Sequence, residues 1–583
     1  MKKIVLYFSA LLLTCGLSAQ SLDPTVRVTG TYRGSVATED LPQEEVALPD
    51  SVAVFDTRFD YSVFEKPYKG SYEFMPYLPD LRPQKQESHR NHLYLRAGAG
   101  FTLHPELDFC WEPEVGDSCL NLSIYTNHRS YLGRYQAYLW DVDQEIACKD
   151  GFESLTHAGV RGRYDFENVY LHWDAAYKGF HGGDGDSPVR TFDTRGFNLA
   201  KADLALQSSA HQTGKVYYAF GLGLDYARAN ERGNGEDRWH RYVDNGCFAL
   251  NGKVGDMISE KHGFEFDFEL GLLLSRSSHY AVQELYNSNA QLFSVTPHYL
   301  LELEKFELDL GAKVAYVARD KQTWNYGSRQ QIFYPDVKIA YDPWNRWATF
   351  FLKATGGIRP NSYEDMLRLN PHFSNFYTGG GVLLDNTVEN LRLALGVEGK
   401  IASRFTYDVE LGYRICGSAP MEMLSPSSII GLWRPDMGFT SFRSLFGTIG
   451  ASYRAEFLDI QAHALFQSTY GLREGAPGLP YFNLPPFVLD FRAVYNWKRR
   501  IFVGLSLDAQ GGRLAVGQDA LGNSFSAGIH PFWNLGAQLS YVISPEWTVW
   551  LKGENLLFQP VQRYVGYAQK GAWGSVGITL NIR

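Results

Sequence analysis

The sequence predicts an all-β chain that folds as an antiparallel barrel and crosses a membrane with its strands. Short segments in which apolar and polar residues alternate recur from residue 92 to the C-terminus. Tight turns and long loops alternate between these segments. The composition agrees, because 36 Tyr, 37 Phe and 13 Trp accompany 55 basic and 64 acidic residues. An aromatic excess of this kind is typical of the girdles at the two surfaces of a membrane barrel.

Residues 1–19 predict export. Two lysines precede an apolar run over residues 4–13, and small residues follow up to Ala19. This pattern is that of a secretory signal peptide, with cleavage expected after Ala19. The apolar run is too short for a transmembrane helix, which needs about 20 residues. Lipidation of Cys15 is the alternative processing route.

Residues 20–91 differ from the rest of the chain. They contain seven prolines and little sustained periodicity, so we expect a short extended periplasmic segment and no folded domain. The stretch from Pro49 to Pro83 is rich in Tyr and Phe. Three roles stay open for it: a substitute plug inside the barrel, a docking segment for a periplasmic partner, or a linker to the first strand.

Residues 92–583 form a succession of two-faced strands. The pattern is clearest over 264–271, 306–316 and 405–414, where one face is apolar and the other is charged. The charged faces are expected to line the barrel lumen, and they carry Glu265, Asp267, Glu269, Glu307, Asp309, Arg392 and Arg414. These residues either define a path for ions or solutes, or form a hydrated lumen in which the acids pair with the arginines.

The segregation of loop lengths favours a membrane barrel over a soluble sheet. Tight turns recur at 165–167, 303–306, 342–346, 400–404, 455–457, 497–499 and 544–547. Long loops fall near 131–152, 180–194, 319–330, 360–385, 418–444, 471–485, 513–530 and 557–570. An outer-membrane barrel has short periplasmic turns and longer extracellular loops, whereas a soluble sandwich has no reason to sort them.

Tryptophans beside the tight turns are expected to form a periplasmic aromatic girdle. They are Trp344, Trp347, Trp497 and Trp547. We count about 22 strands, with about 18 as the lower limit. An even number of strands is required if both termini of the chain are periplasmic.

The end of the chain resembles a known family. The run Gly553-Glu554-Asn555-Leu556-Leu557-Phe558 precedes a glycine-bearing strand over 574–582, as in TonB-dependent outer-membrane receptors. The opening Leu93–Gly100 also resembles the receptor-like barrels of Bacteroidota. The resemblance covers 92–583 and implies a receptor-type barrel in the cell outer membrane. It does not extend to the family's plug domain, because 20–91 is too short and too proline-rich.

A segment near the start of the mature chain resembles the family's TonB box. Thr25, Val26, Arg27, Val28 and Thr29 follow Asp23-Pro24. The resemblance implies pairing with the periplasmic protein TonB through backbone β-augmentation. The alternative is an extended tail that binds no TonB.

The cysteines suggest one specific bond. Five remain after the leader, so at least one is reduced or joined to another molecule. Cys110 and Cys119 are equidistant from a turn centred on Glu114 and Val115, on the polar faces of their strands. A disulfide across this hairpin and two separate thiols are both open.

Catalytic motifs are missing from the sequence. None of the 15 histidines stands in a His-Glu-x-x-His pattern, and neither Cys-x-x-Cys nor Gly-x-Ser-x-Gly occurs. We therefore expect no enzyme, no cofactor and no metal site. A net charge of -9 offers no basic surface for nucleic acid.

Two functions of different classes follow. One is solute transport across the outer membrane, with lipid and TonB as partners. The other is a non-transporting scaffold or accessory subunit of an outer-membrane assembly or secretion complex, with other outer-membrane or periplasmic proteins as partners. The family resemblance favours transport. The missing plug favours the scaffold, since a wide lumen leaks unless partners, inward loops or the N-terminal segment fill it.

Overall fold

The computed structural model describes the chain from residue 92 to residue 582. Gaps in this range are 102, 115–118, 140–143, 185–193, 209–215, 234–238, 279–284, 288, 320–331, 345, 371–383, 403, 427–432, 472–483, 519–523 and 565–570. The expected signal peptide, the 20–91 segment and the TonB-box-like residues 25–29 lie outside the described residues.

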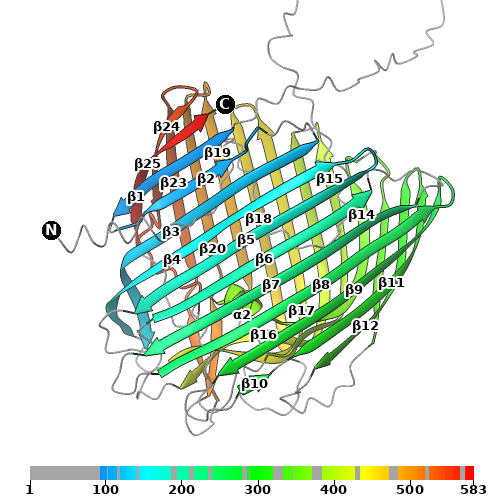
Figure 1. Ribbon diagram of the computed structural model, residues 1–583, viewed down its shortest axis with the longest axis horizontal. Coiled ribbons are helices and arrows are strands. Elements are labelled where there is room, and N and C mark those ends of the chain that lie inside the picture. Colours follow the sequence, from blue (N-terminus) through cyan, green and yellow to red (C-terminus); the bar gives the residue numbers. More distant parts are fainter. Residues whose placement is uncertain are drawn as a thin grey trace, which may run out of the picture. The chain divides into compact units, whose positions relative to one another are not determined.

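Twenty-two strands form one closed antiparallel barrel (Figure 1). The first half of the wall consists of β1 (Leu93–Phe101), β2 (Glu106–Trp111), β3 (Leu120–Leu139), β4 (Gln144–Asp165), β5 (Val169–Asp184), β6 (Thr194–Ser208), β7 (Tyr217–Gly233), β8 (Trp239–Met257), β9 (His262–Ser278), β11 (Ala290–Leu303) and β12 (Phe306–Arg319). The second half consists of β13 (Phe333–Tyr341), β14 (Thr349–Pro360), β15 (Asn386–Ile401), β16 (Phe405–Pro426), β17 (Trp433–Ala455), β18 (Leu458–Gly471), β19 (Phe487–Trp497), β20 (Ile501–Gln510), β23 (Phe532–Val542), β24 (Trp547–Glu554) and β25 (Trp573–Ile582).

The barrel closes between its first and last strands. β1 pairs with β25 along its whole length, from Leu93 opposite Ile582 to Phe101 opposite Gly574. Closure leaves no unpaired edge, which is what a sheet needs in lipid, where backbone groups find no water. The predicted fold class and the upper strand count are confirmed.

Four shorter elements belong to the loops. They are β10 (Leu285–Asn287), the hairpin of β21 (Arg513–Gln518) and β22 (Ser524–Ile529), and α2 (Tyr363–Leu369). β10 pairs antiparallel with the end of β9, and the paired strands β21 and β22 lie between β20 and β23 in the sequence. Among the described residues, no helix has the length and apolarity to cross a membrane.

The strands have an apolar outer face and a mixed inner face. On β9, Phe264 and Phe266 are 54% and 46% exposed, whereas Glu265 between them is 6% exposed. The same alternation separates exposed Leu224 and Tyr226 from inward Asp225 on β7. Because successive side chains of a strand point to opposite faces, one face meets lipid and the other meets the lumen.

The tight turns gather at the end of the barrel where β1 begins and β25 ends. Between β13 and β14, the Asp342 carboxylate accepts hydrogen bonds from the backbone N–H of Trp344 at 3.3 Å and of Arg346 at 2.8 Å. Arg346 has a φ of 68°, which lets so short a turn reverse the chain. At this end of the barrel stand four exposed tryptophans: Trp344, Trp347, Trp497 and Trp547.

The β2–β3 hairpin differs from the expected register. Cys110 lies opposite Tyr125 and Trp111 opposite Ile124, so the hairpin is centred between residues 117 and 118. Cys110 and Cys119 are therefore not cross-strand partners, and of the two alternatives left open for them, the disulfide across the hairpin is not formed. The reason is that the connection after Trp111 is irregular, and alternation alone does not show where the second strand resumes.

Candidate functional site: the barrel lumen

The periplasmic half of the inner wall carries a network of charges, here called the charged wall. Glu265 and Asp267 of β9 contact the Nζ atom of Lys253 on β8, with the Asp267 oxygen at 3.5 Å. On the next two strands of the wall, Nδ1 of His298 on β11 lies 2.7 Å from Oδ1 of Asp309 on β12. These residues sit within a few positions of the tight turns. The charged wall therefore lies near the periplasmic opening.

Two further acids continue the charged wall. The Oε1 atom of Glu307 lies 2.8 Å from Nζ of Lys338. Glu269 is exposed on β9, opposite Ser294 of β11. The acids thus meet lysines and a histidine of neighbouring strands.

Arg392 and Arg414 lie on a different part of the wall. They face each other across β15 and β16. Arg392 Nη2 lies 2.7 Å from Glu410 Oε1, and Arg414 Nη2 donates to Gln467 Oε1 at 2.9 Å. Both guanidinium groups also stack over the ring of Phe446. The expectation that these arginines neutralise the acids of β9 and β12 is therefore wrong, because Arg392 is paired with Glu410 of β16 and Arg414 with Gln467 of β18.

The extracellular half of the inner wall carries an apolar patch, here called the wall panel. It consists of Phe197 and Leu199 on β6, Ala227 and Ala229 on β7, and Val243 on β8. Register aligns Phe197 with Ala229 and Leu199 with Ala227, so large and small side chains alternate across the strands. All five are buried. A lumen-facing patch is buried only if something covers it.

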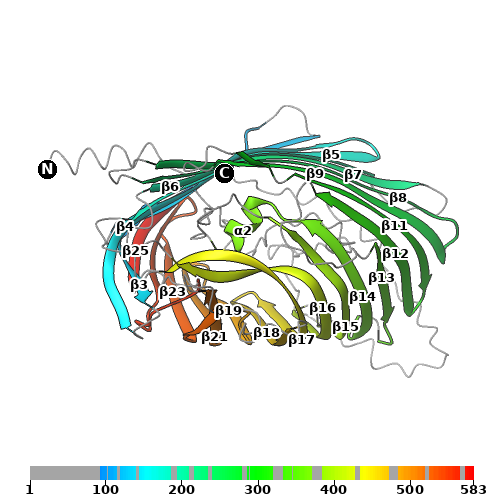
Figure 2. The ribbon, with the colours of Figure 1, turned by 90° about the horizontal axis from the view of Figure 1, so that it is seen from below.

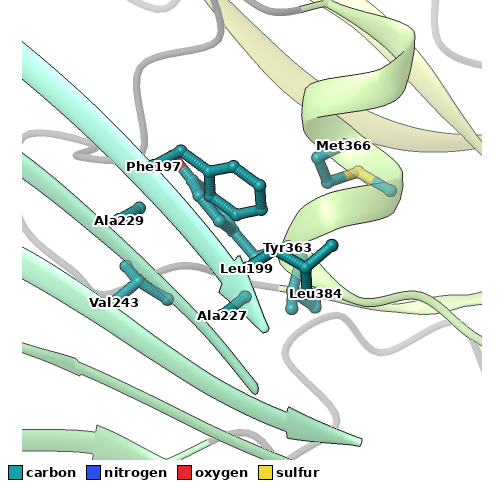
Figure 3. Packing of buried hydrophobic residues seen from close by; sticks show 8 residues of the cluster. All are labelled: Phe197, Leu199, Ala227, Ala229, Val243, Tyr363, Met366 and Leu384. Atoms are coloured by element: carbon teal, nitrogen blue, oxygen red, sulfur yellow. The ribbon is translucent and has the colours of Figure 1, made fainter. Parts of the chain in front are cut away.

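The wall panel is covered by α2, which lies inside the barrel (Figure 2). Tyr363 and Met366 of the helix and Leu384 after it pack against the panel residues (Figure 3). Met366 is 0% exposed. The loop between β14 and β15 therefore folds inward across the lumen.

Local sequence explains why a helix forms there. Ser362 caps it, accepting from the backbone N–H of Asp365, whose carboxylate accepts from the backbone N–H of Ser362. Glu364 and Arg368 form an i,i+4 ion pair at 2.8 Å on the polar side. This reciprocal capping box compensates for a helix of only seven residues.

The two ends of this loop are fixed to the wall. The Asn361 amide donates to the carbonyl of Asp385 at 2.6 Å, and Thr387 Oγ1 donates to Asn361 Oδ1 at 2.9 Å. Arg319, at the end of β12, donates to the carbonyl of Leu384 at 2.6 Å. We call residues 361–370 with 384–386 the inner strap. Its two described ends are hydrogen-bonded to the wall, and α2 packs against the wall panel.

The β16–β17 hairpin covers the inner strap from the other side. These strands are 22 and 23 residues long, about twice what a membrane requires, and they bend across the barrel (Figure 2). Met437 and Phe439 of β17 pack against the cluster that holds α2. The tip of β16 pairs in parallel with β21, Met423 opposite Val516.

An ion pair joins the hairpin to β21. Glu422 Oε2 lies 3.3 Å from Arg513 Nη1, and the two side chains are 10% and 7% exposed. Arg513 also donates to the backbone carbonyl of Arg563. Burial raises the pKa of Glu422 to about 7, and the Arg513 guanidinium and a hydrogen bond with Asn370, the C-cap of α2, offset only part of that. Glu422 is the 18th residue of β16 counted from Phe405, well past the roughly 9–11 residues with which a tilted strand crosses a membrane.

Comparison with known proteins finds solved structures only, since neither a family model nor a curated protein matches the sequence. The FrpB iron transporter from Neisseria meningitidis matches with a TM-score of 0.62 and 10% identity over 84% of this chain and 81% of that one. The ferripyoverdine receptor of the outer membrane of Pseudomonas aeruginosa gives 0.59 and 10% over 84% and 71%. The copper transporter OprC gives 0.55 and 11% over 84% and 80%.

The chain has the barrel fold of these outer-membrane proteins. A closed wall with an apolar outer face is stable only in lipid, so the protein is an outer-membrane barrel. The matched proteins are transporters and a receptor, not enzymes.

The inner strap is the functional feature that alternation does not predict, because 360–385 reads only as a long loop. The sequence does contain a local helix signal. Ser362-x-x-Asp365 has the spacing of a capping box, and Tyr363, Met366 and Leu367 have helical spacing. Inward folding of the loop depends on the wall panel, whose residues come from strands far away in sequence.

Acidity is expected to hold the extracellular opening shut through Glu422. A closed hairpin, in which the pKa of Glu422 is about 7, binds the proton more tightly than an open one, in which the carboxyl titrates near its usual value of 4.5. Closure is therefore strongest below about pH 4.5 and weakens as the pH rises through about 7. Single-channel recordings of the purified barrel should show more open time at alkaline than at acidic pH.

A Glu422→Gln variant should abolish this dependence and stay closed, since the amide mimics the protonated carboxyl. Glu307→Gln is the matched control, because Glu307 is exposed in the lumen and away from the hairpin. An unchanged pH profile in Glu422→Gln would show that another group controls the opening.

Proposed function

We propose that the protein is a solute transporter of the TonB-dependent receptor type, whose own loops close the extracellular half of its lumen. The support is the shared barrel fold and, above all, the inner strap docked on the wall panel. A barrel kept only as a scaffold has no need of an element that crosses its lumen and buries Met366 against the far wall. The arrangement instead places covered apolar residues in one half of the lumen and charged residues in the other.

In this proposal the inner strap and the β16–β17 hairpin take the place of a plug. Among the described residues the lumen contains loop elements and no separate folded domain. The receptor-like barrels of Bacteroidota are the group that the opening Leu93–Gly100 resembles. In this proposal a barrel closed by its own loops restricts passage without a plug domain.

The remaining parts of the chain have roles that follow from this proposal. Residues 1–19 are removed on export, 20–91 stay in the periplasm, and 92–583 form the barrel. The exposed Trp344, Trp347, Trp497 and Trp547 anchor the periplasmic rim in lipid, where indole rings favour the interface. Energy for opening comes from TonB, which pairs with residues 25–29 and pulls on the segment before β1.

Uptake in living cells tests the proposal. A strain that lacks its own copy would express the wild type, Val26→Pro or Val26→Ala, and its accumulation of radioactive iron, copper and zinc chelates would be measured. Proline has no N–H and blocks strand pairing with TonB, whereas alanine keeps the backbone donor. We expect accumulation with wild type and Val26→Ala and a loss with Val26→Pro.

A barrel that changes the accumulation of none of these solutes, and that co-purifies with other outer-membrane proteins, would overturn transport in favour of the scaffold. Equal uptake by Val26→Pro and wild type would remove TonB from the proposal and leave passive passage.

A further inference from the structure

Glu265, Asp267 and His298 converge on one point of the charged wall. Glu265 and Asp267 are two apart on β9, so they point to the same face, and His298 of β11 is the register partner of Glu265. One carboxylate oxygen of each acid and one ring nitrogen of His298 all lie within 4.8 Å of one another. We propose that these three side chains bind a divalent first-row transition metal ion of the zinc class.

His298 is oriented as a metal ligand is. Its side chain is 6% exposed, and Nδ1 lies 2.7 Å from Oδ1 of Asp309. A carboxylate only accepts, so Nδ1 carries the proton and the lone pair of the neutral ring is on Nε2. That nitrogen has no hydrogen-bond partner in the described part of the chain, and it lies 3.8 Å from Oδ2 of Asp267. A carboxylate behind a histidine ring is the usual outer support of a metal site.

Two glycines hold the site in shape by letting aromatic rings lie against the wall. A Cβ on Gly311, the register partner of His298, would stand 2.5 Å from its Cε1 atom. A Cβ on Gly255 would collide with the ring of Tyr217, whose hydroxyl donates to Glu265 Oε2 at 3.0 Å. The orientations of His298 and Glu265 are therefore fixed by packing as well as by hydrogen bonds.

The charge of the cluster favours a dication. Glu265, Asp267 and Asp309 carry three negative charges, and Lys253 supplies one positive charge. With His298 neutral, two negative charges stay uncompensated next to a buried ring, which is costly. A divalent ion removes this imbalance. Lys253 touches both acidic ligands, so its ammonium group competes with the ion and lowers its affinity.

The donor set selects the kind of ion. One imidazole and two carboxylates suit zinc and its neighbours in the first transition row, whereas calcium and magnesium prefer oxygen ligands alone. Sequence motifs do not show such a site, because its ligands come from two strands paired across a sheet. The inference does not depend on transport, since the ion would bind to the wall of a scaffold as well.

Calorimetry with Zn²⁺ tests the site on the refolded, full-length barrel after chelator treatment. We expect one strong binding event per chain, retained in excess Mg²⁺ and Ca²⁺. It should disappear in His298→Ala and weaken about 10- to 100-fold in Asp309→Asn, which keeps the shape but loses the charged acceptor. Lys253→Met should bind more tightly than wild type, because the competing ammonium group is gone.

The control is His463→Ala, which removes an exposed histidine elsewhere on the barrel and should leave the binding intact. Heat-modifiable gel mobility would verify that each variant is folded, and Asp309→Asn serves if His298→Ala does not fold. Absence of stoichiometric zinc binding by folded wild type would overturn the site and leave His298 with only its contacts to Asp267 and Asp309. Binding that survives in folded His298→Ala, or that weakens in Lys253→Met, would overturn it as well.

Discussion

Excision of the inner strap is expected to turn the barrel into a steadily conducting pore. Residues 361–385 would be replaced by a short Gly-Ser linker between Pro360, the end of β14, and Asn386, the start of β15. The wall should still close, because β14 and β15 pair along their lengths without the strap. Conductance in planar bilayers should rise several-fold, since the helix and the side chains that bridge the lumen are gone.

A pair of point variants separates docking of the strap from its mere presence. Met366→Asp places a charge against the wall panel, where burial of an unpaired carboxylate is costly, and should also increase conductance. Leu369→Asp is the matched control, because Leu369 is 46% exposed on the same helix. If the excised barrel conducts no better than wild type, the strap is not the barrier, and the β16–β17 hairpin is the next element to remove.

The barrel wall could be predicted from the sequence because the alternation of apolar and polar residues within each strand depends only on what lies on its two faces. Phe264, Glu265 and Phe266 alternate whatever the neighbouring strands are, since lipid and water lie on opposite faces. Counting such segments is then enough for fold class and strand number. Loop-length asymmetry adds orientation without any knowledge of contacts.

Contacts between strands could not be predicted in the same way. The register of β2 and β3 depends on an irregular connection. Its centre lies three residues later than the sequence suggests, and this shift separates Cys110 from Cys119. The partners of Glu265 and Asp309 depend on which strands adjoin, so the sequence suggested distant arginines where Lys253 and His298 are the true neighbours. Pairing is a property of the assembled sheet.

The packing of loops inside the lumen is harder still to predict from the sequence. Met366 is buried because Phe197, Ala229 and Val243, from three other strands, form a panel of the right shape. None of these residues is unusual within its own strand, and each continues the expected alternation. Only closure of the barrel brings them to face the strap.

Leu395→Lys is expected to destabilise the barrel by about 2–4 kcal/mol, the cost of a lysine facing lipid near the middle of the membrane. Leu395 is 56% exposed on the outer face of β15. Its register partners, Leu352 of β14 and Leu411 of β16, are also exposed leucines, so the new ammonium group has only apolar neighbours in its row. Reversible urea unfolding in phospholipid vesicles measures this loss in the free energy of unfolding.

Glu398→Lys supplies the matched control, because it puts the same side chain on the inner face of the same strand. Glu398 is exposed to the lumen and lies opposite Asp408, which a lysine would attract. Its effect should stay within about 0.5 kcal/mol, as for other exposed substitutions. Equal losses at 395 and 398 would mean that both faces of β15 meet the same surroundings, which is incompatible with a barrel that has lipid outside and water within.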